Sequence, residues 1–286
     1  MKEGMISVLK KSLSLILALL ASLLFWISGL KEDPPKADFY EPVYTDSYTL
    51  LDGLSRSQGV TTDGEYYYFS SNFFLIKTRL DAVTQVASNY LAIPPHLLAK
   101  GCKHIGGITY YDGKIYAPVE DSKVFENLYI CVYDAKTLRF LFSKAVPLEY
   151  HENGIPWCAA DPEKGLIYSA GRDHITSVNA YDAKTLEFVE KIDFEAPVHK
   201  VQGGEMYEGI LYLSISRDDH AVFAINLETG AVRKAFARNL ESSAEGEGMT
   251  ILPGPKGTLF HVLDISSSQL VINFRHYDFD PSSIDW

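Results

Sequence analysis

The sequence lacks the compact motifs of the common cofactor-dependent and metal-dependent enzymes. It has no phosphate-binding loop, no glycine-rich dinucleotide fingerprint, no zinc-binding helix motif and no nucleophile elbow. We therefore expect no cofactor and no metal ion. Cysteine is scarce as well, and two of the three thiols, Cys131 and Cys158, lie in apolar runs typical of strands, while the third is Cys102. We expect buried free thiols, with one disulfide and one free thiol as the alternative.

Basic residues are also in deficit. The chain has 26 Lys and Arg against 37 Asp and Glu, which gives a formal net charge of −11. Nucleic acids and anionic surfaces attract proteins through clustered positive charge. The acidic balance therefore argues against a nucleic-acid partner.

Aromatic residues, in contrast, are abundant, with 18 Tyr and 15 Phe among the 286 residues. Together with Ile, Val and Thr they alternate with polar residues along much of the chain. This pattern favours pleated strands over helices, so the sequence predicts an all-β protein.

One long apolar run departs from this alternation. Residues 12–30 carry no charge and follow a basic segment, residues 1–11, that contains three lysines. A run of about 20 apolar residues is long enough to cross a bilayer as a helix, and lysines before it keep the N-terminus in the cytoplasm. We predict a transmembrane signal anchor, with a cleaved signal peptide as the alternative. A linker over residues 31–40 would then lead to an extracytoplasmic, membrane-anchored domain over residues 41–286, which would be secreted if the signal is cut.

The hexapeptide YDAKTL occurs twice, at residues 133–138 and 181–186, forty-eight positions apart. Alternating, strand-like sequence lies on both sides of each copy, so the motif reads as a turn in which Asp and Thr cap the backbone. Weaker copies occur around Asp81, Asn226 and Asp278. The motif therefore marks five repeats and predicts architecture, not chemistry.

A second series of turns precedes the first in each repeat. Glycine-containing turns join two alternating runs at Gly64, Gly113, Gly165, Gly209 and Gly257. Each repeat then holds four strands, and four-stranded units of about 45 to 50 residues are typical of a β-propeller. We predict five blades, closed by pairing of an N-terminal strand over residues 41–51 with the last blade. A sixth blade is the alternative if the insertion at residues 89–102 hides further strands.

These repeats resemble those of two kinds of propeller. The YDAKTL turns look like those of quinoprotein-like and surface-layer-type propellers. The segments leading into the inner strands resemble plant-type glutaminyl cyclase (glutamine cyclotransferase), a five-bladed propeller whose blades open with polar-Gly motifs. The resemblance covers residues 58–279, and it implies a propeller fold and a glutaminyl-cyclase-like or hydrolytic activity as one functional alternative.

Loops alternate between the two faces of a propeller, so a site is expected on the face opposite the YDAKTL turns. There, polar residues precede a glycine before most inner strands, and Arg residues follow the second strands of two blades. The residues predicted to bind a ligand are Gln58, His104, His151, Glu152, Arg172, Gln202, Arg217 and Glu247. The candidates for acid or base catalysis are Glu245, Glu247, His104 and His151.

Three functions remain open on this evidence. The preferred hypothesis is a membrane-tethered, monomeric binding propeller that holds a small polar ligand or a peptide at the channel mouth. The first alternative is an enzyme on the same scaffold, and the second is a platform for protein interactions. A propeller fold is compatible with all three.

Overall fold

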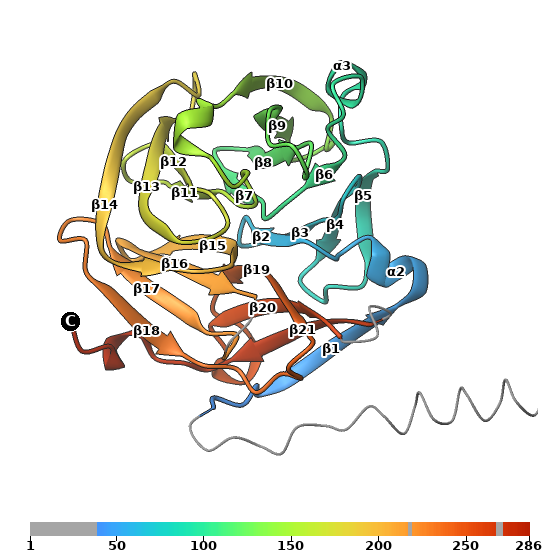
Figure 1. The fold of residues 1–286 in the computed structure, drawn as a ribbon. Coiled ribbons are helices and arrows are strands. Elements are labelled where there is room, and N and C mark those ends of the chain that lie inside the picture. Colours follow the sequence, from blue (N-terminus) through green and yellow to red (C-terminus); the bar gives the residue numbers. More distant parts are fainter. Residues whose placement is uncertain (1–38, 217–218, 267–270) are drawn as a thin grey trace, which may run out of the picture. The chain divides into compact units, whose positions relative to one another are not determined.

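The computed structural model describes residues 39–216, 219–266 and 271–286 (Figure 1). The predicted apolar helix at residues 12–30 and most of the predicted linker lie outside these residues. Within the described part of the chain, no helix is both long enough and apolar enough to span a membrane. The helices there are short: α2 (Leu50–Leu54), α3 (Pro95–Leu98), η1 (Leu148–Tyr150), η2 (Pro255–Gly257) and η3 (Pro281–Ser283).

The strands form five antiparallel sheets, which confirms the predicted five-bladed β-propeller. Their innermost strands contact one another in a closed circuit, from β2 through β7, β11, β15 and β19 back to β2. The first sheet consists of β2 (Gly59–Thr62), β3 (Tyr66–Ser70), β4 (Leu75–Arg79) and β5 (Gln85–Asn89), and the second of β6 (His104–Ile105), β7 (Thr109–Tyr111), β8 (Lys114–Glu120), β9 (Leu128–Asp134) and β10 (Phe140–Ala145). The third sheet consists of β11 (Ala159–Asp161), β12 (Leu166–Ser169), β13 (Ile175–Asp182) and β14 (Phe188–Val198), and the fourth of β15 (Val201–Tyr207), β16 (Ile210–Ile215), β17 (Val222–Asn226) and β18 (Val232–Phe236). The fifth sheet consists of β19 (Glu245–Ile251), β20 (Phe260–Ile265), β21 (Val271–Tyr277) and β1 (Tyr44–Thr49).

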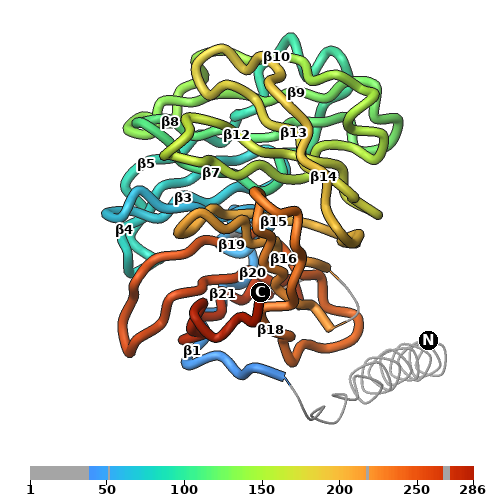
Figure 2. Tube along the Cα trace, turned by 90° about the vertical axis from the view of Figure 1, so that its left-hand side faces the viewer, coloured from blue at the N-terminus to red at the C-terminus, as the bar shows by residue number. Residues whose placement is uncertain are grey.

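The ring closes by pairing of the two ends of the described chain. Strand β1 pairs antiparallel with β21, in a register that sets Tyr44 opposite His276. Figure 2 shows β1 in blue beside the red strands of the C-terminal sheet. The predicted closure is therefore confirmed, although the strand ends at Thr49 and the next residues form α2. Closure leaves β1, in place of β21, as the outer strand of the fifth sheet.

The insertion at residues 89–102 contributes to the core instead of adding a blade. It contains α3, whose Leu97 is fully buried, and it ends at the buried Cys102. No strand lies between β5 and β6. The six-bladed alternative is therefore wrong. All three cysteines are buried and free, which confirms the expected thiols and excludes the disulfide.

Apolar side chains from adjacent sheets pack face to face around the ring. Between the third and fourth sheets, for example, Tyr168 and Val178 meet Leu211 and Leu213, and all four are fully buried. Alternation along each strand places these residues on the faces between sheets, as the sequence pattern predicts.

The axis of the ring is closed by glycines. A Cβ on Gly203 would lie 2.5 Å from the Cα of Gly248, one on Gly248 would lie 2.6 Å from that of Gly59, and one on Gly59 would lie 2.8 Å from that of Gly107. Backbone hydrogen bonds reinforce this approach, because Gly248 N donates to Gln58 O at 2.8 Å. Any side chain at these positions would force the inner strands apart. We call these four residues the glycine ring.

The YDAKTL turns cap the outer strands, as predicted. Oδ1 of Asp134 accepts from the amide and the hydroxyl of Thr137, and Oδ1 of Asp182 accepts the same two bonds from Thr185. Asp81 makes the matching contacts in the first sheet. The repeated motif therefore serves the fold.

Candidate functional site

A polar pocket of about 300 Å³ opens at one mouth of the axis, and all five sheets contribute to its lining. Gln58, Gln202 and Glu247 each directly precede a member of the glycine ring, so the closed axis forms the floor. Loops between second and third strands supply the wall. We call this pocket the cup; its lining residues are Gln58, Asn72, His104, Glu120, Ser122, Phe125, Asn153, Pro156, Arg172, Gln202, Glu245 and Glu247.

On one side of the cup, a histidine lies between an amide and a carboxylate. Nε2 of His104 lies 2.6 Å from Oε1 of Gln58, and its Nδ1 lies 3.2 Å from Oε1 of Glu120. Glu120 is itself held by the backbone amide of Ile155, which donates to its Oε2 at 2.7 Å. Gly154 makes room for this carboxylate, since a Cβ there would lie 2.5 Å from Oε2. Gln58 therefore orients the ring of His104, while Nδ1 of the ring lies near Glu120 without a hydrogen bond to it.

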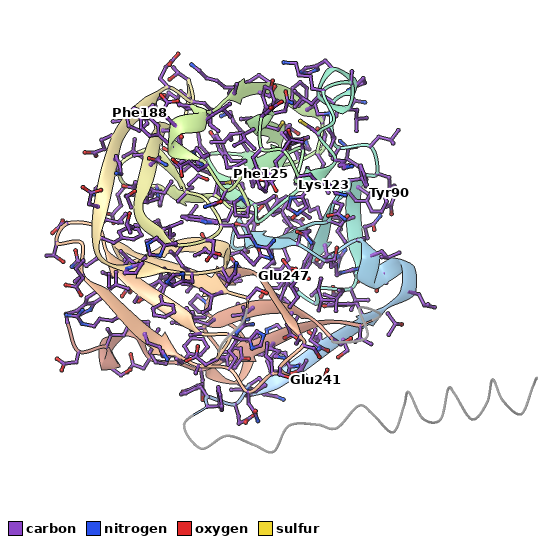
Figure 3. All side chains as sticks on the ribbon, in the orientation of Figure 1. Tyr90, Lys123, Phe125, Phe188, Glu241 and Glu247 are labelled. Atoms are coloured by element: carbon purple, nitrogen blue, oxygen red, sulfur yellow. The ribbon has the colours of Figure 1, made fainter. Side chains whose placement is uncertain are left out.

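On the floor of the cup, Glu247 is a buried carboxyl with no hydrogen-bond donor among the described residues. The residue is 2% exposed, and the hydroxyl of Ser214 donates to its backbone carbonyl and not to its carboxyl. Figure 3 shows it close to the centre of the ring of sheets. Burial and the neighbouring charge of Glu245 raise the pKa of Glu247 well above its ordinary value, although Arg172 and Arg238 oppose the shift. Two more atoms of cup residues, Nδ1 of His104 and Nε of Arg172, are buried without a hydrogen-bond partner among the described residues. Polar groups of this kind are rare and call for a ligand or water.

One nitrogen of the Arg172 guanidinium, Nη2, is held within the protein, whereas its Nε is buried without a hydrogen-bond partner among the described residues. Its Nη2 lies 3.3 Å from Oε1 of Glu245. With its amide oxygen turned toward this group, Gln202 accepts from Nη2 at 3.1 Å and donates to the carbonyl of Val201 at 3.3 Å. The arginine therefore links the fifth sheet to the third and fourth sheets.

Acidic groups outnumber basic ones in the cup. Three carboxyls, those of Glu120, Glu245 and Glu247, face one guanidinium, that of Arg172, and the ring of His104. The cup is therefore electrostatically negative when its carboxyls are ionised. Across the described residues, no group of three or more His, Cys, Asp and Glu side chains is arranged to hold a metal ion.

The structure brings together Gln58, His104, Arg172, Gln202, Glu245 and Glu247 from the predicted set. Two other predicted residues lie elsewhere. His151 is buried with its Nε2 at 2.7 Å from the hydroxyl of Tyr181, and burial lowers its pKa to about 4. Glu152 lines a neighbouring pocket of about 210 Å³ together with Asp173. Arg217 lies outside the described residues.

Six further lining residues are absent from the predicted set, namely Asn72, Glu120, Ser122, Phe125, Asn153 and Pro156. Asn72 lies in the loop after the second strand of the first sheet, the same place that Arg172 takes in the third sheet. Extending the comparison of this loop to the first repeat would have found it.

The fold and the cup together define a five-bladed β-propeller with a polar pocket over a closed axis. No protein-family model matches the chain, and no curated protein matches it. Among solved structures, "Structure of U3-55K" aligns with a TM-score of 0.46 and 12% identity, over 82% of this chain and 66% of that one. "Crystal structure of RRP9 WD40 repeats" aligns with a TM-score of 0.48 and 10% identity, over 82% of this chain and 84% of that one.

Proposed function

We propose that this propeller is a binding protein that holds a small polar ligand, or a polar segment of a peptide, in the cup. A five-bladed propeller is compatible with a ligand-binding or protein-binding platform. The observation that carries the proposal is the carboxyl of Glu247, a residue that is 2% exposed, which has no hydrogen-bond donor among the described residues and lies on the floor of a pocket lined from all five sheets. A ligand would supply the missing hydrogen bond.

Rigidity supports this function. The glycine ring fixes the backbone below Gln58, Gln202 and Glu247, and Gln202 is further held by Arg172. Polar groups that are already fixed lose little conformational entropy when a ligand binds. The cup is therefore suited to selective recognition of a small molecule.

The proposal includes export and tethering by residues 12–30, on the strength of their uncharged sequence after three lysines. It also keeps the likeness to quinoprotein-like and surface-layer-type propellers and to plant-type glutaminyl cyclase, which rests on the turn and blade motifs. Fractionation of cells that express the full chain tests the tether. Removal of residues 12–30 should release the protein from the membrane fraction.

An enzymatic role is favoured by one contact, the approach of His104 to Glu120 at 3.2 Å. A carboxylate beside an imidazole can orient it and assist a proton transfer. Glu245 and Glu247, the predicted partners of this histidine, make no hydrogen bond to it or to His151 among the described residues. If the protein is an enzyme, the pair that moves the proton is His104 and Glu120.

A thermal-shift screen of the full-length protein tests the binding proposal. A ligand that binds the folded state raises the melting temperature, by an amount set by its concentration relative to Kd. Amines, carboxylates, sugars and short peptides should be compared at equal concentration. Compounds that raise the melting temperature should no longer do so in Gln202→Ala. They should still do so in Glu228→Gln, which changes an exposed residue in the turn between β17 and β18. A flat response from every class would overturn the proposal.

A further inference from the structure

A second pocket adjoins the cup and differs from it in chemistry. Its volume is about 380 Å³, and it shares the lining residues Gln58, Asn72 and Glu245 with the cup, so the two pockets lie side by side. Its remaining lining is largely apolar: Leu50, Gly53, Leu54, Ser57, Ile265 and Ile272. We call it the apolar pocket.

The apolar pocket exposes hydrocarbon that a lone domain would ordinarily bury. Leu54 is 57% exposed and Leu50 is 76% exposed, and both belong to the short helix α2 after the closing strand. Large apolar side chains gathered beside a polar cleft commonly mark a binding surface. Here they stand next to carboxyl groups of the cup.

We propose that the ligand is an amphipathic amine, with its ammonium group in the cup and its hydrocarbon part in the apolar pocket. This inference rests on the proposed function and adds a chemical class to it. The ammonium would meet the carboxyls of Glu247 and Glu245. Amide oxygens of Gln58 and Asn72, at the junction of the two pockets, can accept its remaining hydrogens.

The charges of the cup favour a cation over an anion. A carboxylate or phosphate would approach three carboxyls, those of Glu120, Glu245 and Glu247. One guanidinium lines the cup to attract it, that of Arg172, and its Nη2 is held by Glu245 and Gln202 while its Nε has no hydrogen-bond partner among the described residues. An ammonium instead pairs with the unpartnered Glu247. Burial favours the protonated form of this carboxyl in the empty cup, so pairing would release a proton.

Isothermal titration of the full-length protein with straight-chain ammonium ions, from methylammonium to hexylammonium, tests the inference. Affinity should rise about fourfold for each methylene that enters the apolar pocket. Carboxylates and alcohols of the same chain lengths should bind at least tenfold more weakly. Titration in two buffers of different ionisation enthalpy should show a proton released when the amine binds.

Two variants separate binding of the ammonium group from binding of the hydrocarbon part. Leu54→Ser should flatten the dependence on chain length while methylammonium binding stays unchanged, and Leu91→Ser, at another site that is 85% exposed, should alter neither. Glu247→Gln should weaken every amine at least tenfold. If that variant melts below the temperature of the assay, Glu245→Gln, whose side chain is 38% exposed, replaces it.

The outcomes distinguish this inference from the function on which it rests. Binding of sugars or carboxylates without amines would overturn the amine and leave the binding function standing. Amines that bind with no dependence on chain length, or with the same dependence in Leu54→Ser, would overturn the role of the apolar pocket. A protein that binds no class of compound would overturn both.

Discussion

His261 and His276 face each other through their Nδ1 atoms, 2.6 Å apart, inside the sheet that closes the ring. Nε2 of His261 lies 2.7 Å from the carbonyl of Leu252, so this nitrogen carries a proton and Nδ1 of the same ring accepts. The shared proton therefore belongs to Nδ1 of His276 when both rings are neutral. Nε2 of His276 lies 3.3 Å from Oδ2 of Asp46 on β1, and burial raises the pKa of that carboxyl.

This pair predicts loss of stability in mild acid. Burial lowers the pKa of both His261 and His276 from 6.5 to about 4. Between these values the unfolded chain binds protons that the folded chain does not, so stability falls as the pH drops below 6.5 and levels off below 4. The pair should cost roughly 2 to 5 kcal/mol between pH 7 and pH 4.5. Urea unfolding at several pH values measures this loss.

The matched variants for the histidine pair are the double substitution His261→Gln with His276→Gln and, as a control, the exposed His96→Gln. The double variant should show a shallower dependence of unfolding free energy on pH than the wild type, even if it is less stable at pH 7. The control should keep the wild-type slope. Equal slopes in all three proteins would contradict the assignment.

The glycine ring makes a second prediction, because Gly203 has no room for a methyl group. Its Cβ would lie 2.5 Å from the Cα of Gly248, and backbone atoms cannot yield as side chains do. Gly203→Ala should therefore lower the unfolding free energy by about 2 to 4 kcal/mol. Gly171→Ala is the control, since its nearest neighbour would be 3.7 Å away. Similar melting temperatures for both variants would show that the axis is looser than described.

The buried thiols predict an all-or-none reaction with a thiol reagent. Burial raises the pKa of Cys102 to about 11 and that of Cys131 to about 12, and it raises the pKa of Cys158 further. The reactive thiolate is therefore scarce, and the sulfur atoms are shielded. The folded protein should react at none of its three cysteines and the denatured protein at all three. Fast labelling of one thiol in the folded state would refute the burial of that cysteine.

Five blades and their closure were predictable because repetition makes strand alternation and turn chemistry readable. The floor of the cup was predictable only in repeats where a polar residue directly precedes the glycine at the axis. Gln58, Gln202 and Glu247 directly precede a glycine that contacts its neighbour across the axis. In the third repeat Pro156 takes that place, five positions after His151, and the ring of His151 turns into the sheet toward Tyr181. Sequence spacing alone does not reveal such a shift.

The apolar pocket could not be predicted from the sequence, for a different reason. Leu50 continues the alternation of β1, and it was therefore expected to belong to the strand. The chain leaves the sheet at Thr49 and Leu50 adopts a positive φ of 53°, which starts α2 and brings Leu54 beside the cup. A residue other than glycine in this backbone region is uncommon, and periodicity gives no sign of it.

The two YDAKTL turns test whether their face of the propeller serves the fold and not ligand binding. Asp182→Ala removes the acceptor for the amide and hydroxyl of Thr185 and should cost about 1 kcal/mol of stability. Asp182→Asn should cost less, because Asn226 takes the same place in the fourth sheet and accepts from the amide of Thr229 at 3.1 Å. Chemical denaturation measures both losses, and ligand affinity should stay unchanged in both variants, since the turns lie on the face opposite the cup. A loss of binding in Asp182→Ala without a loss of stability would assign this turn to the site.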